Sequence, residues 1–219
     1  MSLYNLTRLQ RLTAGILLSR DERDFIADMP ELQGNEWEAK NLPRPPWVWG
    51  DGEKIKALKD SIRASLNELH GEYCIYCGMD LNVTSGNQIE HIAPKARYPK
   101  FTFERFNLVL ACSLCNGFEK KERAGYWDTV AQPSDIYEDC EFRIVHPYFD
   151  EPEDHLELNR HGGKVLIKGL SAKGLRSIET FLLDGEPLTN QRGTLVIRQM
   201  YNLNPAMEAL VESTISRVQ

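Results

Sequence analysis

Hydrophobic spacing along the chain predicts one helix more clearly than any other element. Within residues 53–70, isoleucine and leucine recur at intervals of three and four: Ile55, Leu58, Ile62, Leu66 and Leu69. Residues with this spacing lie on one face of an α-helix, so we expect an amphipathic helix that packs this face into a core. Gly71 follows directly and favours a helix end, because glycine accepts the left-handed conformation found there.

The residues after position 150 show weaker patterns. Two short segments rich in apolar residues, at 155–158 and 164–167, flank a turn with two glycines at 159–163, which is typical of a β-hairpin. Helical spacing returns twice, at 175–183 and at 194–218. We therefore expect a C-terminal region of mixed helix and strand.

The N-terminal part is expected to be helical and then irregular. Apolar residues at mixed spacing favour a helix over residues 3–28, which Pro30 ends. A stretch rich in proline and tryptophan follows at 42–50; we expect it to pack on the main body, with peptide binding as the alternative. The patterns divide the chain into an N-terminal extension at 1–52, a core at 53–150 and a C-terminal region at 151–219.

The cysteines form the strongest chemical pattern in the chain. Four of the five cysteines form two Cys-x-x-Cys pairs: Cys74 with Cys77, and Cys112 with Cys115. Such a pair places two sulfur atoms on one edge of a tetrahedron, so two pairs complete the ligand shell of a zinc ion. A complete shell leaves no open position for a substrate, which indicates structural zinc.

Two other interpretations of these cysteines were weighed. A redox Cys-x-x-Cys site needs only one pair and a thioredoxin-like βαβ setting, and no such setting is indicated here. Four unrelated buried cysteines would not explain the repeated spacing. The fifth cysteine, Cys140, is expected to be a lone semi-buried thiol.

The segment between the two cysteine pairs carries the candidate catalytic residues. It contains Gln88-Ile-Glu90-His91-Ile-Ala-Pro94, then Asn107-Leu108, and the second pair is followed by Asn116. Over residues 72–123 this order resembles the HNH endonucleases of the ββα-metal, zinc-knuckle type. Two residues depart from the commonest pattern: Glu90 stands where aspartate is usual, and Asn116 stands where histidine is frequent, although asparagine occurs in related nucleases.

The resemblance implies a fold and a set of roles. The fold would be α+β, with a treble-clef-like ββα core built around the zinc. His91 would be the general base, since an unperturbed imidazole accepts a proton near neutral pH. Glu90 and Asn116 offer oxygen ligands that suit Mg²⁺ or Mn²⁺, and Asn107 would hold the loop that orients His91. Helix capping is the alternative role for Asn116.

The negative net charge of the chain limits how it could bind DNA. The formal net charge is −6, so binding to phosphates must depend on a local patch of basic residues. Basic residues gather between the catalytic histidine and asparagine, at Lys95, Arg97, Lys100 and Arg105. Lys95 and Arg97, together with Lys120 one helical turn after Asn116, are the candidate DNA-binding residues.

A short acidic segment after the core allows a second interpretation. His146 and His155 enclose several carboxylates there, so a second metal site was weighed against a turn that leads into the hairpin, which we favour. A comparable acidic, proline-containing segment occurs in standalone bacterial HNH nucleases of antiphage systems, of the Septu and retron-associated kind. This resemblance implies a nuclease subunit that works with an ATPase partner.

The sequence therefore predicts a metal-dependent endonuclease acting on DNA. The main alternative is a non-catalytic zinc-knuckle module that binds nucleic acid or protein, which would need the cysteines but not Glu90, His91 and Asn107. A degenerate HNH fold that serves only as a scaffold is a further alternative. No apolar run approaches the roughly 20 residues of a membrane span, and no signal-peptide pattern is found, so we expect a cytoplasmic protein without membrane contact.

Overall fold

The computed structural model describes residue 7 and residues 9–29, 31–38, 51–82, 87–116 and 128–201. Several expectations concern residues outside these ranges. They are the start of the N-terminal helix, the proline- and tryptophan-rich stretch at 42–50, the candidate DNA-binding residue Lys120, and the part of the last helix beyond residue 201.

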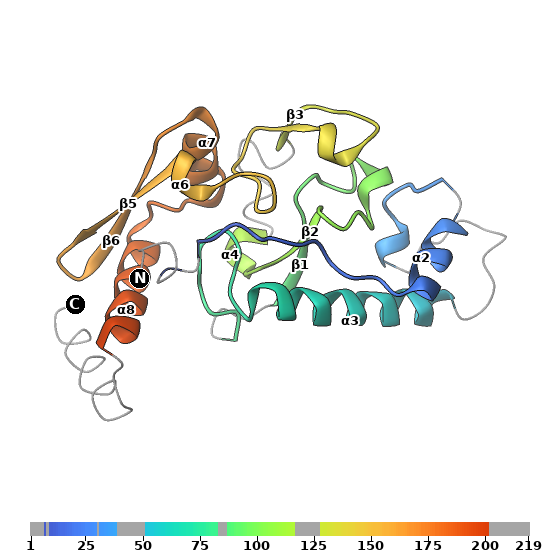
Figure 1. Ribbon diagram of the computed structural model, residues 1–219, viewed down its shortest axis with the longest axis horizontal. Helices are drawn as coiled ribbons and strands as arrows, with labels where there is room; N and C mark the ends of the chain where they lie inside the picture. The colour runs from blue at the N-terminus through green and yellow to red at the C-terminus, as the bar shows by residue number, and fades with distance from the viewer. Residues whose placement is uncertain are drawn as a thin grey trace.

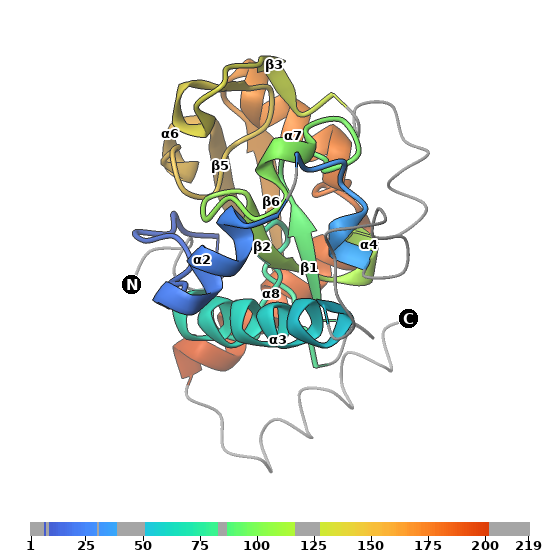
Figure 2. The ribbon, with the colours of Figure 1, turned by 90° about the vertical axis from the view of Figure 1, so that its right-hand side faces the viewer.

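Helix α3, at Asp51–His70, is the helix that the hydrophobic spacing predicts. Ile55, Leu58, Ile62 and Leu66 are each at most 2% exposed, so this face of the helix packs into the core. The helix ends at Gly71, which has a φ of 69°, as the sequence indicated. Figures 1 and 2 show α3 running along one side of the core, beneath the central hairpin.

The central hairpin carries the candidate catalytic residues. Strand β1, at Gln88–His91, pairs antiparallel with strand β2, at Leu108–Ala111, and His91 lies opposite Leu108. All four residues of β2 are buried. Helix α4, at Ser113–Asn116, follows β2 and contains the second cysteine pair's last member, Cys115. Two strands followed by a helix form the expected ββα core.

The N-terminal part is less helical than its spacing suggested. In the described residues 9–29 and 31–38, only α2, at Arg20–Ala27, and the 3-10 helix η1, at Glu36–Glu38, are helical. Residues 9–19 run as an irregular segment, which pairs with the core through hydrogen bonds from Leu12 N to the Pro147 oxygen and from Ile16 N to the Arg105 oxygen. The apolar residues of this irregular segment pack individually against the core. Their spacing is therefore set by the positions of those contacts and not by the period of a helix.

A second small sheet follows the core. Strand β3, at Val130–Gln132, pairs antiparallel with β4, at Glu141–Phe142, and the 3-10 helix η3, at Tyr137–Asp139, lies between them. The aromatic rings of this region contact one another, and the His146 ring stacks on the Phe149 ring at a centroid distance of 4.2 Å. This aromatic cluster lies between the central hairpin and the C-terminal region.

The C-terminal region forms one hairpin with helices beside it. A short helix α6, at Pro152–His155, leads into β5, at Leu156–His161, which pairs antiparallel with β6, at Lys164–Gly169. Helices α7, at Ala172–Phe181, and α8, at Glu186–Tyr201, follow and contact β6. The predicted hairpin is confirmed with longer strands, and Figure 1 shows this unit at the end of the molecule opposite α2.

These elements confirm the α+β fold class with a zinc-knuckle ββα core. None of the helices in the described ranges is both long enough and apolar enough to cross a membrane.

Candidate metal centre and active site

The four paired cysteines converge on one point. Their sulfur atoms all lie within 4.8 Å of one another, and the Cys77 and Cys112 sulfurs are 3.7 Å apart. A zinc ion with four sulfurs at about 2.3 Å requires sulfur–sulfur distances of about 3.8 Å. All four side chains are fully buried, and all are free thiols. The donor set and its spacing therefore fit a tetrahedral structural zinc.

Backbone hydrogen bonds shape the first cysteine pair. Cys74 N donates to the Met79 oxygen at 2.7 Å, and Gly78 N donates to the Cys74 oxygen at 2.8 Å. Gly78 has a φ of 74°, a conformation that glycine adopts without steric cost. Ile75 N donates to the Leu110 oxygen and so attaches this turn to β2, immediately before the second pair.

The four thiols influence one another through hydrogen bonds. Hydrogen bonds from Cys115, Cys74 and Cys77 hold the pKa of Cys112 far below its ordinary value. A thiolate is therefore favoured at Cys112, and thiolate is the form that binds zinc.

A pocket of about 200 Å³ beside the central hairpin brings the candidate catalytic residues together. Its walls include Glu90, His91, Lys95 and Asn116. Trp37 and Glu38, from the N-terminal 3-10 helix, complete it. The sequence analysis grouped Glu90, His91, Lys95 and Asn116 as candidate site residues. Trp37 and Glu38 lie about fifty residues before Glu90 and belong to no motif that would have marked them as part of the site.

The surroundings of His91 determine which ring nitrogen is basic. Its Nε2 lies 3.0 Å from the Thr102 carbonyl oxygen, and a carbonyl only accepts, so Nε2 carries the hydrogen. The basic nitrogen of the neutral ring is then Nδ1. The residue is 6% exposed, and its ring makes a T-shaped contact with the Trp37 ring at a centroid distance of 4.7 Å. Burial, then the charge of Lys95, lowers the pKa of His91 to about 3, so the imidazole is neutral at pH 7 but is a weaker base than the unperturbed ring expected from the sequence.

Asn107 ties together the loop that follows His91. Its Oδ1 accepts a hydrogen bond from Ala93 N at 2.6 Å, and its Nδ2 donates to the oxygens of Ala93 and Phe101 at 3.1 and 2.8 Å. Thr102, whose carbonyl orients His91, is the residue after Phe101. Asn107 is fully buried and does not line the pocket, so this geometry supports a positioning role and no contact with substrate.

A chain of buried hydrogen bonds runs from Tyr148 through His146 and Tyr137 to the side chain of Asn107. Tyr148 N donates to His146 Nδ1, so the hydrogen of the neutral His146 ring is on Nε2, which lies 3.0 Å from the Tyr137 hydroxyl. The Tyr137 hydroxyl in turn donates to Asn107 Oδ1 at 3.0 Å. Burial, then the charge of Lys173, holds the pKa of His146 well below its usual value, so this orientation persists at neutral pH. Sequence reasoning did not identify this relay.

The predicted DNA-binding residues do not all lie in the pocket. Lys95 lines it and forms an ion pair with Glu38 at 3.3 Å. Arg97 lies outside it, 3.8 Å from Asp128. Lys100, from the same basic stretch, pairs with Asp135 at 2.7 Å. In the folded chain, Glu38, Asp128 and Asp135 therefore partly neutralise the basic residues that are clustered in the sequence.

The acidic segment after the core is a structural network. Asp150 accepts hydrogen bonds from His146 N and from the Lys173 ammonium group, while His155 Nδ1 lies 2.7 Å from the Ser171 hydroxyl. Within the described ranges, the cysteine cluster is the one group of three or more histidine, cysteine or acidic side chains close enough to share an ion. The segment is thus the turn that the sequence favoured.

Asn116 lies at the end of the short helix α4. This helix begins at Ser113, and Asn116 N donates to the Cys112 oxygen at 2.9 Å. The capping alternative concerns a helix that would begin directly after Cys115, and residues 117–127 lie outside the described ranges, so capping stays an alternative prediction. Asn116 lines the pocket beside Glu90 and His91.

Comparison with known proteins agrees with this geometry. Residues 74–122 match the HNH endonuclease family. The chain is 26% identical to the Septu protein PtuB of Bacillus mycoides over 198 residues, which cover 75% of this chain and 67% of that protein. It is 27% identical to the Septu protein PtuB of Bacillus thuringiensis over 138 residues, or 63% of this chain and 43% of that protein.

A phage protein shows a more local similarity. The protein ea31 of Escherichia phage lambda is 33% identical over 81 residues, which cover 37% of this chain and 22% of ea31. The family match spans both cysteine pairs and the pocket residues between them. The chain therefore contains an HNH endonuclease domain and is related in sequence to the Septu proteins PtuB.

Proposed function

We propose that the protein is a metal-dependent endonuclease that hydrolyses phosphodiester bonds in DNA. The observation that carries this proposal is the pocket that holds His91 beside Glu90 and Asn116, with the His91 ring fixed by the Thr102 carbonyl. A base, two oxygen ligands and a cation from Lys95 are the groups that phosphodiester hydrolysis requires.

The chemistry follows from the proton on the His91 ring. With Nε2–H bonded to the Thr102 carbonyl, Nδ1 takes a proton from water as the water oxygen attacks phosphorus. The bond from phosphorus to the leaving oxygen then breaks. Glu90 and Asn116 would hold Mg²⁺ or Mn²⁺, which supplies a Lewis acid for the phosphate and the leaving oxygen. Lys95 would exchange its contact with Glu38 for a DNA phosphate.

Cleavage of supercoiled plasmid tests this proposal against the non-catalytic alternative. With Mg²⁺ or Mn²⁺ the protein should convert the plasmid to nicked or linear forms, and EDTA should stop the reaction. A zinc-knuckle binding module would instead shift the plasmid in a gel without cutting it. Single-stranded DNA in a parallel reaction gives the strandedness of the substrate.

Asn116→Ala should lower cleavage by about a hundredfold or more, if the Asn116 oxygen binds the catalytic ion. Cleavage by this variant should also need more Mg²⁺. Asn116→His and Asn116→Asp should retain more activity, because each presents a ligand atom from the same helix turn. The measurement is a Mg²⁺ titration of the initial rate for all three variants. An unchanged Mg²⁺ requirement in Asn116→Ala would exclude Asn116 as a ligand.

Tyr137→Phe should lower kcat about tenfold while leaving KM and zinc content close to wild type. It removes the hydroxyl that joins His146 to Asn107, and misplacing the His91 loop slows the chemical step. Tyr98→Phe is the matched control, since it removes a hydroxyl that makes no hydrogen bond within the described ranges. Equal kcat values for the two variants would show that the relay does not position the loop.

We further propose that the protein is the nuclease subunit of a cytoplasmic antiphage system. The sequence relationship to the Septu proteins PtuB supports this assignment. The net charge of −6 and the ion pairs on Lys95 and Arg97 favour weak DNA binding by the chain alone, so a partner such as an ATPase subunit would deliver the DNA. Plasmid reactions with and without a co-expressed partner test this dependence.

A further inference from the structure

Three arginines from separate parts of the chain surround one carboxylate. The Asp128 oxygens lie 3.1, 3.8 and 3.9 Å from side-chain nitrogens of Arg143, Arg97 and Arg176, which we call the arginine cluster. Arg176 also donates to Glu179 at 3.0 Å. Among the described residues, three positive charges are therefore paired with two negative ones, in a chain whose net charge is −6.

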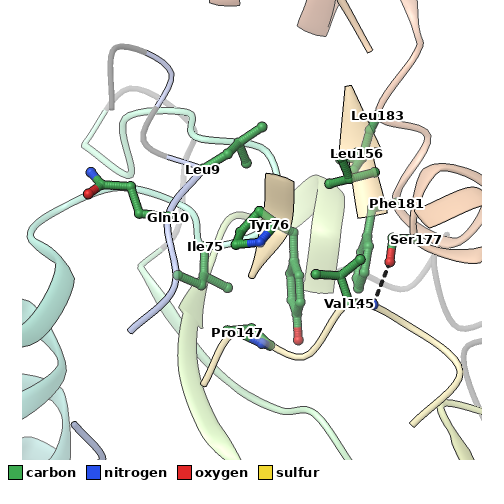
Figure 3. A pocket seen from close by; sticks show the side chains of 11 residues that line it. Leu9, Gln10, Ile75, Tyr76, Val145, Pro147, Leu156, Ser177, Phe181 and Leu183 are labelled. Atoms are coloured by element: carbon green, nitrogen blue, oxygen red, sulfur yellow. Dashed lines mark hydrogen bonds between the residues drawn. The ribbon is translucent and has the colours of Figure 1, made fainter. Parts of the chain in front are cut away.

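A hydrogen bond between neighbouring residues fixes two of these arginines relative to each other. Val145 N donates to the Ser177 hydroxyl at 2.8 Å, and Figure 3 draws this bond as a dashed line in the wall of an apolar pocket. Val145 lies two residues after Arg143 in the chain. Ser177 is buried and directly follows Arg176 on α7. The backbone that carries both arginines is therefore held in place without their side chains, which can bind a ligand.

The arginine cluster lies beside the catalytic pocket. Thr129, which follows the shared aspartate, donates from its hydroxyl to the oxygen of Ile92 at 2.7 Å, and Ile92 is the residue after His91. On the other side, Arg97 N donates to the Pro94 oxygen at 2.9 Å and closes a turn whose first three residues line the pocket. The cluster is thus attached to the segment that carries the proposed base.

The charge and the exposure of the cluster suit a phosphate. Like charges gathered around one carboxylate repel one another, and an additional anion relieves this repulsion. The side chains of Arg97, Arg143 and Arg176 are 53%, 45% and 25% exposed, so an anion from solvent can reach them. A guanidinium presents its donors in a planar fork that matches two phosphate oxygens, and such contacts position DNA on a protein.

We propose that Arg97, Arg143 and Arg176 form a second phosphate-binding site, which holds the DNA backbone next to the scissile phosphate. This proposal rests on the proposed nuclease function, and it adds α7 to the DNA-binding surface, beyond residues 74–122 that match the HNH family. Asp128 orients the arginines in the free protein, and a DNA phosphate competes with it for their donors. The C-terminal unit thereby takes part in binding the substrate.

Fluorescence anisotropy of a labelled DNA duplex tests the proposal in the full-length protein, at low salt and without added Mg²⁺ or Mn²⁺. Arg143→Gln combined with Arg176→Gln should weaken binding about tenfold or more, the loss expected for charge-assisted contacts. The dependence of the binding constant on salt should also become shallower, by about one logarithmic unit per lost phosphate contact. Arg20→Gln is the control, because it removes the same charge from α2, at the opposite end of the molecule in Figure 1. It should bind DNA almost as tightly as wild type.

Asp128→Asn should change binding in the opposite direction. Without the competing carboxylate, the duplex should bind about two- to fivefold more tightly, a change of the size that one exposed ion pair produces. If the network of ion pairs only stabilised the fold, Asp128→Asn and the double arginine variant would both lower the melting temperature and neither would bind DNA more tightly.

Wild-type affinity in the double variant would overturn the proposal and indicate that the cluster binds an acidic protein surface instead. An equal loss in Arg20→Gln, or weaker binding by Asp128→Asn, would also overturn it. If the double variant does not fold, Arg143→Gln alone, at a half-exposed side chain, is compared with Asp128→Asn in the same way. Plasmid cleavage by the wild-type protein reports separately on the nuclease function: binding through the cluster without any cleavage would refute that function and not the phosphate site.

Discussion

Replacing Cys112 or Cys74 by serine is expected to yield unfolded or insoluble protein. Structural zinc contributes about 10–16 kcal/mol of binding free energy, which is folding free energy when the site exists only in the folded chain. A domain of ordinary stability is only about 5–15 kcal/mol more stable than its unfolded state. All four cysteines are fully buried at the junction of the first knuckle, β2 and α4, so losing the ion removes the link among these elements.

The fifth cysteine provides the matched control for this experiment. Cys140 is buried but lies outside the cluster, and its sulfur accepts a hydrogen bond from Ser134 N. Cys140→Ser should cost about 1 kcal/mol and leave zinc content unchanged. Solubility, circular dichroism and metal analysis of the three variants give the comparison. A folded, zinc-free Cys112→Ser protein would show that the cluster does not hold the core together.

His91→Ala should lower cleavage by about a hundred- to ten-thousandfold, the usual contribution of a general base. The zinc ligands are untouched, so one zinc per chain should remain. Some stability should be lost, because the buried ring contacts Trp37 and donates to the Thr102 carbonyl. Single-turnover cleavage, metal analysis and thermal unfolding together separate loss of chemistry from loss of fold.

A half-buried histidine outside the pocket, His70, is the control for His91. His70 lies at the end of α3, accepts a hydrogen bond from Leu110 N at 3.3 Å, and does not line the pocket. His70→Gln should therefore reduce stability and leave the cleavage rate of the folded protein close to wild type. If His91→Ala cleaves as fast as wild type, the proposed base is wrong, and equal losses in both variants would indicate a structural role.

The sequence predicted the four-cysteine cluster well because its determinants are local. A Cys-x-x-Cys turn fixes its own geometry within four residues, and both pairs flank the hairpin that carries the histidine. The helix at 53–70 was equally predictable, since one face is buried along its whole length. The apolar spacing after position 8 wrongly predicted a helix. Residues 9–19 form an irregular segment, and its apolar side chains contact the core individually instead of along one helix face.

The part of the pocket wall that Trp37 and Glu38 form could not be predicted from the sequence. Trp37 and Glu38 reach His91 and Lys95 only because the N-terminal segment folds back across the core. The partner of Asn107 was also hidden, because Tyr137 lies thirty residues later in a short 3-10 helix without a motif. Long-range contacts of this kind depend on the tertiary fold, and a single sequence contains no local pattern for them.

Two metals with separate roles are central to this account, and one measurement tests them together. Purified protein is treated briefly with EDTA, desalted, analysed for zinc, and assayed for plasmid cleavage with no added metal and then with Mg²⁺ or Mn²⁺. We expect about one zinc per chain to remain in the buried cluster, no cleavage without added metal, and restored cleavage with either ion. Cleavage that persists without added Mg²⁺ or Mn²⁺, or folded protein without zinc, would contradict the account.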